Sequence, residues 1–395
     1  MIRSLKRYAV NFLRVIFSRD IHHLLRDATS FYLSHRFIRV KYSQEQKKNC
    51  LQDAIIWLEK SINPDDGGFR TWYYAGGWTS SYPETSGYII PTLLEYAQKQ
   101  HRQDLIQRCI QTADWLIEIQ KPTGGWQSGY IHENKKEVVF NTGQVIRGLY
   151  AIYKKTGEIK YLNPCIKACE WLCSIQEEDG SWQKHAFMNK KRVYESYVDH
   201  PLLLIALETG KKEFELAVRK NLHWILTQQL ANGWFENCDN TIKHNDRPIL
   251  HTIAYTLDGL IQCGILLNET KYIQSAQIAA DRLLEIFNRN GWLNGRWNNE
   301  WKGSQAMICT GGAQIAIVWM RLFKYNQHAK YLEAAQKMNN QLCFIQKHHL
   351  DKSHPSFGAI PGSFPLWGRY EPFGFPNWAT KYFADSIMME LEILK

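Results

Sequence analysis

Apolar positions along the chain follow two helical patterns, separated by loops that pair glycine with an aromatic residue. The first pattern is amphipathic: apolar residues recur at i, i+3, i+4 and i+7, with Lys, Glu and Gln between them. This spacing predicts helices that bury one face and expose the other. The segments with this pattern span residues 46–62, 103–120, 160–176, 213–229, 270–288 and 329–346.

The second pattern is uncharged, rich in small residues and apolar nearly all round, which is typical of helices surrounded by protein. Glycines such as Gly87, Gly148 and Gly259 within these segments allow neighbouring helices to approach closely. The segments span residues 84–96, 142–153, 199–207, 251–263, 310–320 and 377–389. We therefore expect outer helices of the first kind and inner helices of the second kind.

The loops between each outer and inner helix repeat the same short phrase, and this repeat is the strongest signal in the sequence. The first five loop cores recur at intervals of 52 to 58 residues, and the sixth is a longer version. Their sequences are Asp66-Gly67-Gly68-Phe69, Gly124-Gly125-Trp126, Asp179-Gly180-Ser181-Trp182, Asn232-Gly233-Trp234, Asn290-Gly291-Trp292 and Phe357-Gly358-Ala359-Ile360-Pro361-Gly362.

Six hairpins of this kind predict an all-α fold, an (α/α)6 toroid in which a ring of inner helices lies inside a ring of outer helices. An open solenoid of hairpins is the alternative. The closed ring is favoured because six is the usual closure number. It is also favoured because the first and last hairpins are no more polar than the others, whereas the ends of a solenoid need polar caps.

Charge changes the picture at one end of the chain. The net charge is +10, and residues 1–41 hold nine Lys or Arg against two Asp, interleaved with apolar residues. We expect a basic amphipathic arm over 1–41 and the toroid over 42–395. The arm could lie on an anionic membrane surface or pack on the body, and it is too short and too charged to span a bilayer. The body lacks the basic stripe of a nucleic-acid-binding protein.

The nine cysteines contain no C-x-x-C pair, and several fall at apolar helix positions, as buried thiols do. The N-terminus has no uninterrupted apolar run and no small-residue cleavage site. These observations predict a reduced, cytoplasmic protein, which could be peripheral on the inner membrane. Neither a cofactor nor a bound metal is expected.

Candidate catalytic residues gather where the inner helices begin. In this topology all six helices start at the same rim, and their positive dipole ends suit anions and developing negative charge. Ser, Thr, Asn and Asp there can be simple helix caps, but capping does not explain the His, Tyr and Glu residues. The catalytic candidates are His200, His251, Tyr255, Glu84, Tyr197 and Asp199.

The same rim supplies a predicted substrate-binding surface of aromatic and basic residues. Aromatic faces stack on sugar rings and Arg forks pair with carboxylates, so an acidic sugar such as a uronate is the expected ligand. The binding candidates are Arg70, Trp72, Trp78, Tyr82, Gln144, His132, Arg192, Tyr194, Arg247, Arg296, Trp297, Gln314, Arg369, Asn377 and Lys381.

Three phrases carry a family resemblance: Gln120-x5-Trp126, Gln176-x5-Trp182 and Gln228-x5-Trp234 are similar to the Q-W repeats of triterpene cyclases. The chain thus resembles the six-barrel toroid superfamily, which includes terpenoid cyclases, protein prenyltransferase β-subunits and many polysaccharide enzymes. The acidic D-x-D-D proton donor of the cyclases is absent, and no convincing match to the prenyltransferase zinc set occurs.

The resemblance that remains is to the uronate-acting branch, glucuronyl C5-epimerases and toroidal polysaccharide lyases. It implies an enzyme that abstracts the C5 proton of an acidic glycan, which could be lipid-linked, with a Tyr or His base. A glycoside hydrolase that uses the Glu84–Asp199 pair is the second possibility, and an isoprenoid cyclase or transferase the third. A non-catalytic glycan-binding protein is the alternative outside enzymes.

Overall fold

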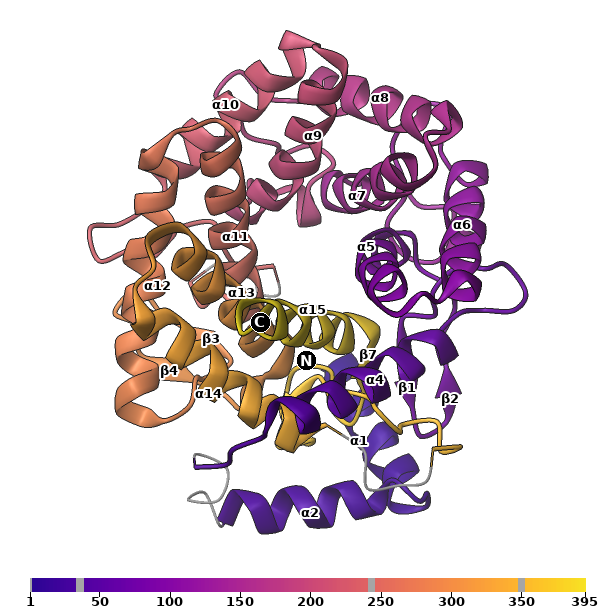
Figure 1. Ribbon diagram of the computed structural model, residues 1–395, viewed down its shortest axis with the longest axis vertical. Helices are drawn as coiled ribbons and strands as arrows, with labels where there is room; N and C mark the ends of the chain where they lie inside the picture. Colours follow the sequence, from indigo (N-terminus) through magenta and orange to yellow (C-terminus); the bar gives the residue numbers. More distant parts are fainter. Residues whose placement is uncertain (1, 33–38, 241–245, 347–351) are drawn as a thin grey trace.

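The computed structural model describes residues 2–32, 39–240, 246–346 and 352–395, and it has the predicted two rings of helices (Figure 1). The outer helices are α4 (Gln44–Lys60), α6 (Gln103–Glu118), α8 (Ile159–Ser174), α10 (Lys212–Thr227), α12 (Thr270–Asn290) and α14 (Ala329–Ile345). The inner helices are α5 (Pro83–Gln100), α7 (Val139–Thr156), α9 (Ser196–Thr209), α11 (Leu250–Leu266), α13 (Cys309–Asn326) and α15 (Asn377–Ile393).

The ring closes between the last hairpin and the first. Helix α15 packs against both α13 and α5, so each inner helix contacts the next around the circle. Between the two layers, Lys47 of α4 forms a buried ion pair with Glu390 of α15, and Asn339 of α14 donates a 2.7 Å hydrogen bond to the same carboxylate. The closed toroid is confirmed, and the open solenoid is wrong.

A glutamine after four of the outer helices ties its own loop to the next outer helix. Its side-chain amide donates to the carbonyl of the loop glycine and to a carbonyl of the following helix. The four are Gln120 (Gly124, Pro164), Gln176 (Gly180, Ala217), Gln229 (Gly233, Ser275) and Gln346 (Gly358, Cys50). In the fourth repeat, therefore, Gln229 and not Gln228 takes this role, because the loop is one residue shorter.

The backbone conformation of these loops requires glycine. Gly180 has a φ of +88°, a left-handed conformation that favours glycine. A Cβ atom there would also lie 2.5 Å from the backbone of Lys220 in the next outer helix. The repeated glycine–aromatic phrase is thus the result of a tight turn pressed against a neighbouring helix.

The inner helices approach one another closely, as their small residues predict. A Cβ atom at Gly148 of α7 would lie 2.3 Å from the carbonyl oxygen of Gly87 in α5, and one at Gly259 would lie equally close to Ser196. Only glycine fits at such crossings. These residues therefore let neighbouring inner helices pack closely, which reduces the diameter of the inner ring.

Short strands and turns build the rim where the inner helices begin. Strand β1 (Trp72–Tyr74) pairs antiparallel with β2 (Gly77–Trp78) and with β7 (Phe375–Pro376), which joins the first loop to the last. Two further pairs are β3 (Arg296–Trp297) with β4 (Gly303–Ser304) and β5 (Met307–Ile308) with β6 (Ser363–Phe364). The 3-10 turns are Ile131–Glu133, Phe187–Asn189 and Val193–Glu195.

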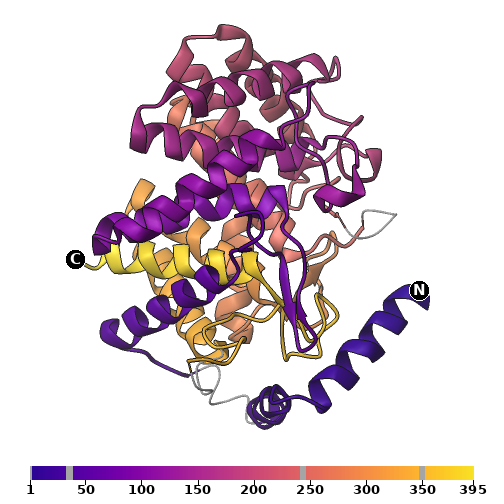
Figure 2. The ribbon, with the colours of Figure 1, turned by 90° about the vertical axis from the view of Figure 1, so that its right-hand side faces the viewer.

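The N-terminal arm forms helices α1 (Ile2–Ile16) and α2 (Ile21–Tyr32), which lie outside the toroid against the last loop (Figure 2). The hydroxyl of Tyr8 donates to the carbonyl of Trp367, and buried His23 lies 3.0 Å from the hydroxyl of Ser356. Residues 33–38 of the predicted arm lie outside the described part of the chain. The domain division at residue 41 stays a prediction.

Candidate active site

A cavity of about 1250 Å³ lies at the rim where the inner helices begin, and we call it the loop-side cavity. Its walls come from the first turns of the inner helices and from the loops before them. The lining residues used below are Trp72, Tyr82, Glu84, Lys135, Lys136, Asn141, Lys184, Tyr194, His251, Tyr255, Glu371 and Trp378. Residues more than 290 positions apart in the chain thus share one space, as the toroid predicts.

His251 stands in the first turn of α11 and is nearly buried, with 7% of its surface exposed. Its Nδ1 lies 2.7 Å from the side-chain oxygen of Gln314. Because an amide oxygen only accepts hydrogen bonds, Nδ1 must carry the proton and Nε2 must hold a lone pair. Burial lowers the pKa of His251 to about 4, against the opposite effect of the Gln314 hydrogen bond. At neutral pH the ring is therefore neutral, with Nε2 able to accept a proton.

A layer of tyrosines closes the bottom of this cavity. The rings of Tyr255 and His251 are 4.4 Å apart, and those of Tyr255 and Tyr197 are 4.5 Å apart. The hydroxyl of Tyr382 lies 3.1 Å from that of Tyr197 and 3.3 Å from that of Tyr255. Burial raises the pKa of Tyr255 well above its usual range, and the nearby carboxyl of Glu84 adds to the shift. Burial also raises the pKa of Tyr382, so the phenols of Tyr255 and Tyr382 are protonated at neutral pH.

Glu84, in the first turn of α5, is the carboxyl group at the cavity wall with the most perturbed acidity. Burial raises its pKa to about 8, and a hydrogen bond with Tyr82 acts in the opposite direction. Asn141 fixes this tyrosine, because its amide nitrogen lies 3.2 Å from the Tyr82 hydroxyl and also donates to the carbonyl of Gln127. At neutral pH Glu84 is mostly the neutral acid, which can donate a hydrogen bond or a proton.

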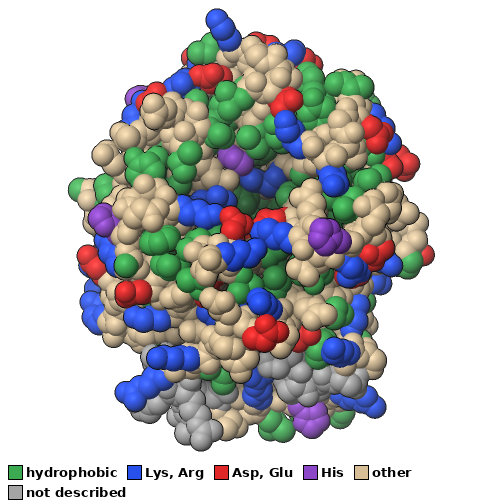
Figure 3. Space-filling view, in the orientation of Figure 1, with side chains coloured by type: hydrophobic (Ala, Val, Ile, Leu, Met, Phe, Trp, Pro, Cys, Tyr) green, Lys and Arg blue, Asp and Glu red, His purple; other side chains and the backbone are tan. Residues whose placement is uncertain are grey.

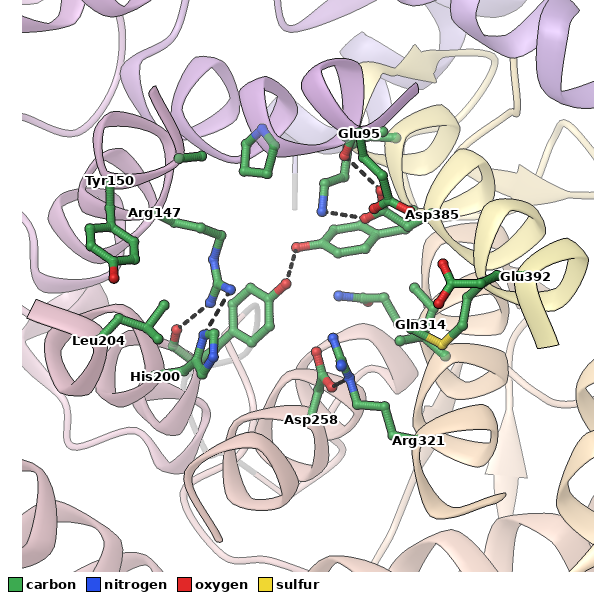
Figure 4. Close-up of a pocket in the computed structure, with 18 of the residues that line it drawn as sticks. Glu95, Arg147, Tyr150, His200, Leu204, Asp258, Gln314, Arg321, Asp385 and Glu392 are labelled. Carbon is green, nitrogen blue, oxygen red and sulfur yellow. Dashed lines mark hydrogen bonds and ion pairs between the residues drawn. The ribbon is translucent and has the colours of Figure 1, made fainter. Parts of the chain in front are cut away.

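A second, smaller cavity of about 400 Å³ opens at the other end of the axis, between the later turns of the inner helices. We call it the far-side cavity. Figure 3 shows the hollow at this end with basic and acidic side chains around it, and Figure 4 shows the residues that line it. Lys381 pairs with Asp385 at 2.6 Å, and Arg321 pairs with Asp258.

His200 belongs to the far-side cavity, so the two predicted histidines do not share a site. Its Nδ1 lies 3.1 Å from Nη1 of Arg147, whose Nη2 donates to the carbonyl of Tyr197 (Figure 4). Burial lowers the pKa of His200 well below its usual range, and Arg147 adds to the shift. His251 is the second residue of its helix and His200 the fifth of its own, and the two lie on opposite sides of the tyrosine layer.

Several other predicted residues also lie away from the loop-side cavity. Asp199 is fully buried and accepts a 2.7 Å hydrogen bond from Asn221. Gln144 accepts from Nε of Arg147, while Lys381 and Gln314 line the far-side cavity. Of the predicted catalytic residues, the structure brings together His251, Tyr255 and Glu84 in the loop-side cavity, with Tyr197 beneath them.

None of the five predicted arginines lines either described cavity. Arg70 donates to the carbonyls of Lys60 and Ile62 and stacks on Trp78, so it holds its loop. Buried Arg192 donates to the carbonyl of Asp239.

Of the remaining three, Arg296 pairs with the carboxylate of Asp239 at 3.0 Å and also donates to the carbonyl of Arg247. Arg247 itself and Arg369 are exposed outside the cavity. In place of arginines, the cavity wall holds Lys135, Lys136 and Lys184. Arg70, Arg192 and Arg296 thus satisfy loop carbonyls and a buried carboxylate, which sequence alone does not reveal.

Some of the predicted aromatic residues line the loop-side cavity, and others pack elsewhere in the fold. Trp72, Tyr82 and Tyr194 line the loop-side cavity. Trp78 stacks on Trp57 with ring centroids 5.1 Å apart, and Trp297 is buried in the core.

Two polar binding candidates also have other contacts. His132 stacks on Tyr130, which lines the cavity, with centroids 5.6 Å apart. The amide of Asn377 donates to the carbonyl of Arg70 and to the hydroxyl of Thr85, so it caps and joins helices.

Some lining residues were missed by the sequence interpretation. Asn141 and Trp378 each stand at the start of an inner helix, the position that marked the other candidates. Glu371 and the three lysines come from long loops of irregular sequence. For those loop residues the sequence contains no periodic signal, because loop conformation decides which side chains turn inward.

Comparisons with known proteins agree with the toroid. The chain is 26% identical over 237 residues to the squalene–hopene cyclase of Zymomonas mobilis, a match that covers 53% of this chain and 34% of the cyclase. The chain thus spans about a third of the length of that curated relative.

Two solved structures are similar in fold. An unsaturated glucuronyl hydrolase specific for heparin has a TM-score of 0.70 at 15% identity, over 89% of this chain and 98% of that one. The cellobiose 2-epimerase of Spirochaeta thermophila has a TM-score of 0.67 at 10% identity, over 89% and 97%.

A family match bears on the same region as the site. Residues 113–311 match the family described as the ulvan lyase N-terminal domain, and this segment runs from α6 into α13. It includes Asn141, His251 and Tyr255 of the loop-side cavity. The chain belongs to the ulvan lyase N-terminal domain family.

Proposed function

We propose that this chain is a carbohydrate-active enzyme that binds an acidic, uronate-containing glycan in the loop-side cavity and abstracts the proton at C5. The observation that carries the proposal is the state of His251. Its Nδ1 proton is tied to Gln314, which leaves Nε2 as a base, and its pKa of about 4 keeps the ring neutral near pH 7. Membership of a family described as a lyase domain supports the same reading.

The other lining groups suit the remaining parts of this chemistry. The neutral carboxyl of Glu84 donates a hydrogen bond to the uronate carboxylate. Lys136 and Lys184 of the rim add positive charge, whereas Lys135 is already paired with Glu133. Both effects stabilise the enolate-like charge that forms when C5 loses its proton. Trp72 and Trp378 offer aromatic faces to the sugar rings.

The reaction then proceeds in one of two balanced ways. In both, Nε2 of His251 takes the C5 proton and the electron pair moves into the carboxylate. In the lyase reaction the C4–O bond breaks, a C4=C5 double bond forms, and the hydroxyl of Tyr255 protonates the leaving oxygen. In the epimerase reaction Tyr255 returns a proton to the opposite face of C5, and no bond of the chain is cleaved.

The test uses the purified full-length protein with a panel of uronate polysaccharides that includes ulvan and heparin, in D2O buffer. A lyase produces an unsaturated uronate that absorbs in the ultraviolet, and an epimerase introduces deuterium at C5 without shortening the chain. The variant His251→Gln is the control and should show neither. If the wild-type protein binds these glycans but gives no absorbance, no exchange and no cleavage, a glycan-binding role replaces the enzyme.

A glycoside hydrolase is the second candidate, and one observation favours it. Glu84, with its pKa near 8, and Glu371 line the same cavity, so an acid and a second carboxyl group are both present. This pair takes the place of the predicted Glu84–Asp199 pair, since Asp199 is buried elsewhere. The same panel separates the two reactions, because a hydrolase releases reducing ends without ultraviolet absorbance or deuterium at C5.

Cyclase chemistry has less support in the site. The acidic pair nearest to a cyclase motif, Asp65-Asp66, lies in the first loop, where Asp66 accepts hydrogen bonds from the backbone of Gly68 and the hydroxyl of Ser81. These contacts shape the turn. Neither residue lines the loop-side cavity.

A further inference from the structure

Helix α1 packs its polar side on the protein and turns its apolar side to solvent. The side toward the body carries Arg7, which bonds to Tyr74 and Glu371, and Asn11, whose amide donates to the carbonyl of Pro372 at 3.2 Å. Val15, one turn further, is buried. These residues and Tyr8 follow each other at helical spacing, so they form one face.

The opposite face holds the large apolar residues of the helix and of the residue just after it. Leu5 is 62% exposed, Leu13 is 52% exposed and Phe17 is 85% exposed. Val10 flanks them and is also exposed, and Phe12 lies at the edge of this face, 40% exposed, with its ring 5.6 Å from that of Phe373. An amphipathic helix ordinarily buries its apolar side. An apolar stripe that faces outward is therefore a surface available for binding a partner or a membrane. Figure 2 shows α1 at the edge of the molecule, outside the body of the toroid.

The charges of the arm identify the kind of surface that fits. Its acidic residues, Asp20 and Asp27, are buried: Asp20 accepts from the hydroxyl of Ser356 and Asp27 from the backbone of Leu366. Beside the apolar stripe, Lys6, Arg14 and Arg19 are exposed, and the described part of the chain shows no ion pair for any of them. The arm therefore presents only positive charge to its surroundings.

We propose that α1 docks on the surface of an anionic lipid bilayer, with Leu5, Val10, Phe12, Leu13 and Phe17 among the headgroups and the basic residues at the lipid phosphates. A second copy of this face fits poorly, because two sets of unpaired cations would oppose each other. The helices of the described chain include none with the length and apolarity to cross a bilayer. Docking in the plane of the interface is the arrangement that an exposed apolar stripe with flanking cations favours.

The contacts of α1 also fix the position of the docking helix relative to the loop-side cavity. Arg7 joins the helix to Glu371, and Glu371 lines the loop-side cavity. The docking helix is thus anchored beside the rim of that cavity. This surface does not depend on the reaction proposed above, and its test requires no substrate.

The test is sedimentation of the full-length protein with vesicles. Vesicles of equal parts phosphatidylcholine and phosphatidylglycerol should bind the protein at low salt, and pure phosphatidylcholine vesicles should not. The double variant Leu13→Asp, Phe17→Asp should weaken binding about tenfold or more, because both side chains leave the apolar stripe. The matched control Leu216→Asp changes a leucine that is 59% exposed on outer helix α10, and it should bind as the wild type does.

A second readout reports on insertion directly. The residues 1–41 contain no tryptophan, so Phe17→Trp is a new reporter in the arm, and brominated lipids should quench its fluorescence. Equal binding to both kinds of vesicle, unchanged binding of the double variant, or no quenching would each overturn the proposal. So would a dimer in solution that the double variant dissociates, because the apolar face would then belong to a second copy.

Discussion

The two cavities on the axis of the toroid lie on either side of one tyrosine layer, yet they treat charge in opposite ways. In the far-side cavity two ion pairs dominate, Lys381 with Asp385 and Arg321 with Asp258, although buried His200 is neutral there as well. In the loop-side cavity burial keeps groups neutral: Glu84 holds its proton and His251 has lost one. Paired charges stabilise a structure, whereas an unpaired acid beside an unpaired base is ready to exchange protons.

The position of each cavity explains part of this difference. The loop-side cavity meets the first turns of the inner helices, whose positive dipole ends favour negative charge that develops during a reaction. The far-side cavity lies beyond these first turns, so it lacks the positive dipole ends, and Arg147, Arg321 and Lys381 line it. We therefore place the chemistry at the loop side and a structural role at the far side.

The strongest test of this comparison replaces each of the two histidines in a separate variant. We expect His251→Gln to lower kcat by about 10²- to 10⁴-fold, since it removes the proposed base. His200→Gln should change kcat less than about threefold, because a substitution remote from the reacting atoms leaves the barrier intact. Steady-state rates on an active uronate glycan measure both. Equal losses in the two variants would mean that the assignment of roles to the cavities is wrong.

The pH dependence of activity tests whether Glu84 and His251 are both neutral near pH 7. Activity should rise as pH increases through about 4, where His251 loses its proton, and fall as pH increases through about 8, where Glu84 loses its own. In Glu84→Gln the amide stays a neutral donor at every pH, so the fall near pH 8 should disappear.

The pH dependence of folding stability gives an independent measure of the raised pKa of Glu84. The folded protein retains the Glu84 proton up to about pH 8, whereas the unfolded chain releases it near the ordinary value of 4.5. The contribution of Glu84 to stability is thus present below pH 4.5 and is lost as pH rises toward 8. Urea melts across this range should show a smaller decline for Glu84→Gln than for the wild type. Parallel curves would contradict the raised pKa.

Gln314 touches both sides of the layer, so changing it sharpens the boundary between them. Gln314→Leu removes the acceptor that fixes the Nδ1 proton of His251 and leaves the ring free to change tautomer. We expect kcat to fall about tenfold with little change in KM, the size of one lost hydrogen bond. Nitrogen NMR of the histidine reports the tautomer. A fixed tautomer with normal kcat would show that Gln314 has no positioning role.

The smallest effect is expected at Arg147, which links helices around the far-side cavity. Arg147→Lys loses the planar fork that reaches Gln144, His200 and the carbonyl of Tyr197. We expect a destabilisation of about 1–2 kcal/mol in chemical denaturation and unchanged kcat. A large loss of activity with normal stability would instead assign this cavity a function of its own.

Sequence by itself determined the repeat and the helices. The spacing of apolar residues located twelve helices of the two rings to within a few residues, because burying one face or all faces leaves a periodic trace. The loop glycines and two of the four linking glutamines, Gln120 and Gln176, were also visible, since the same phrase recurs from repeat to repeat. Of the catalytic candidates, His251, Tyr255 and Glu84 could be found because each stands in a first or second turn of an inner helix.

Tertiary structure alone decided on which side of the tyrosine layer a residue lies and what it contacts. His200 and His251 look equivalent in sequence, but the packing of their helices places the two side chains in different cavities. The arginines of the loops look like ligand-binding groups, yet they satisfy carbonyls and carboxylates of the fold. The outward apolar face of α1 is likewise invisible in its sequence, because periodicity reveals that a helix is amphipathic but not which face the body takes.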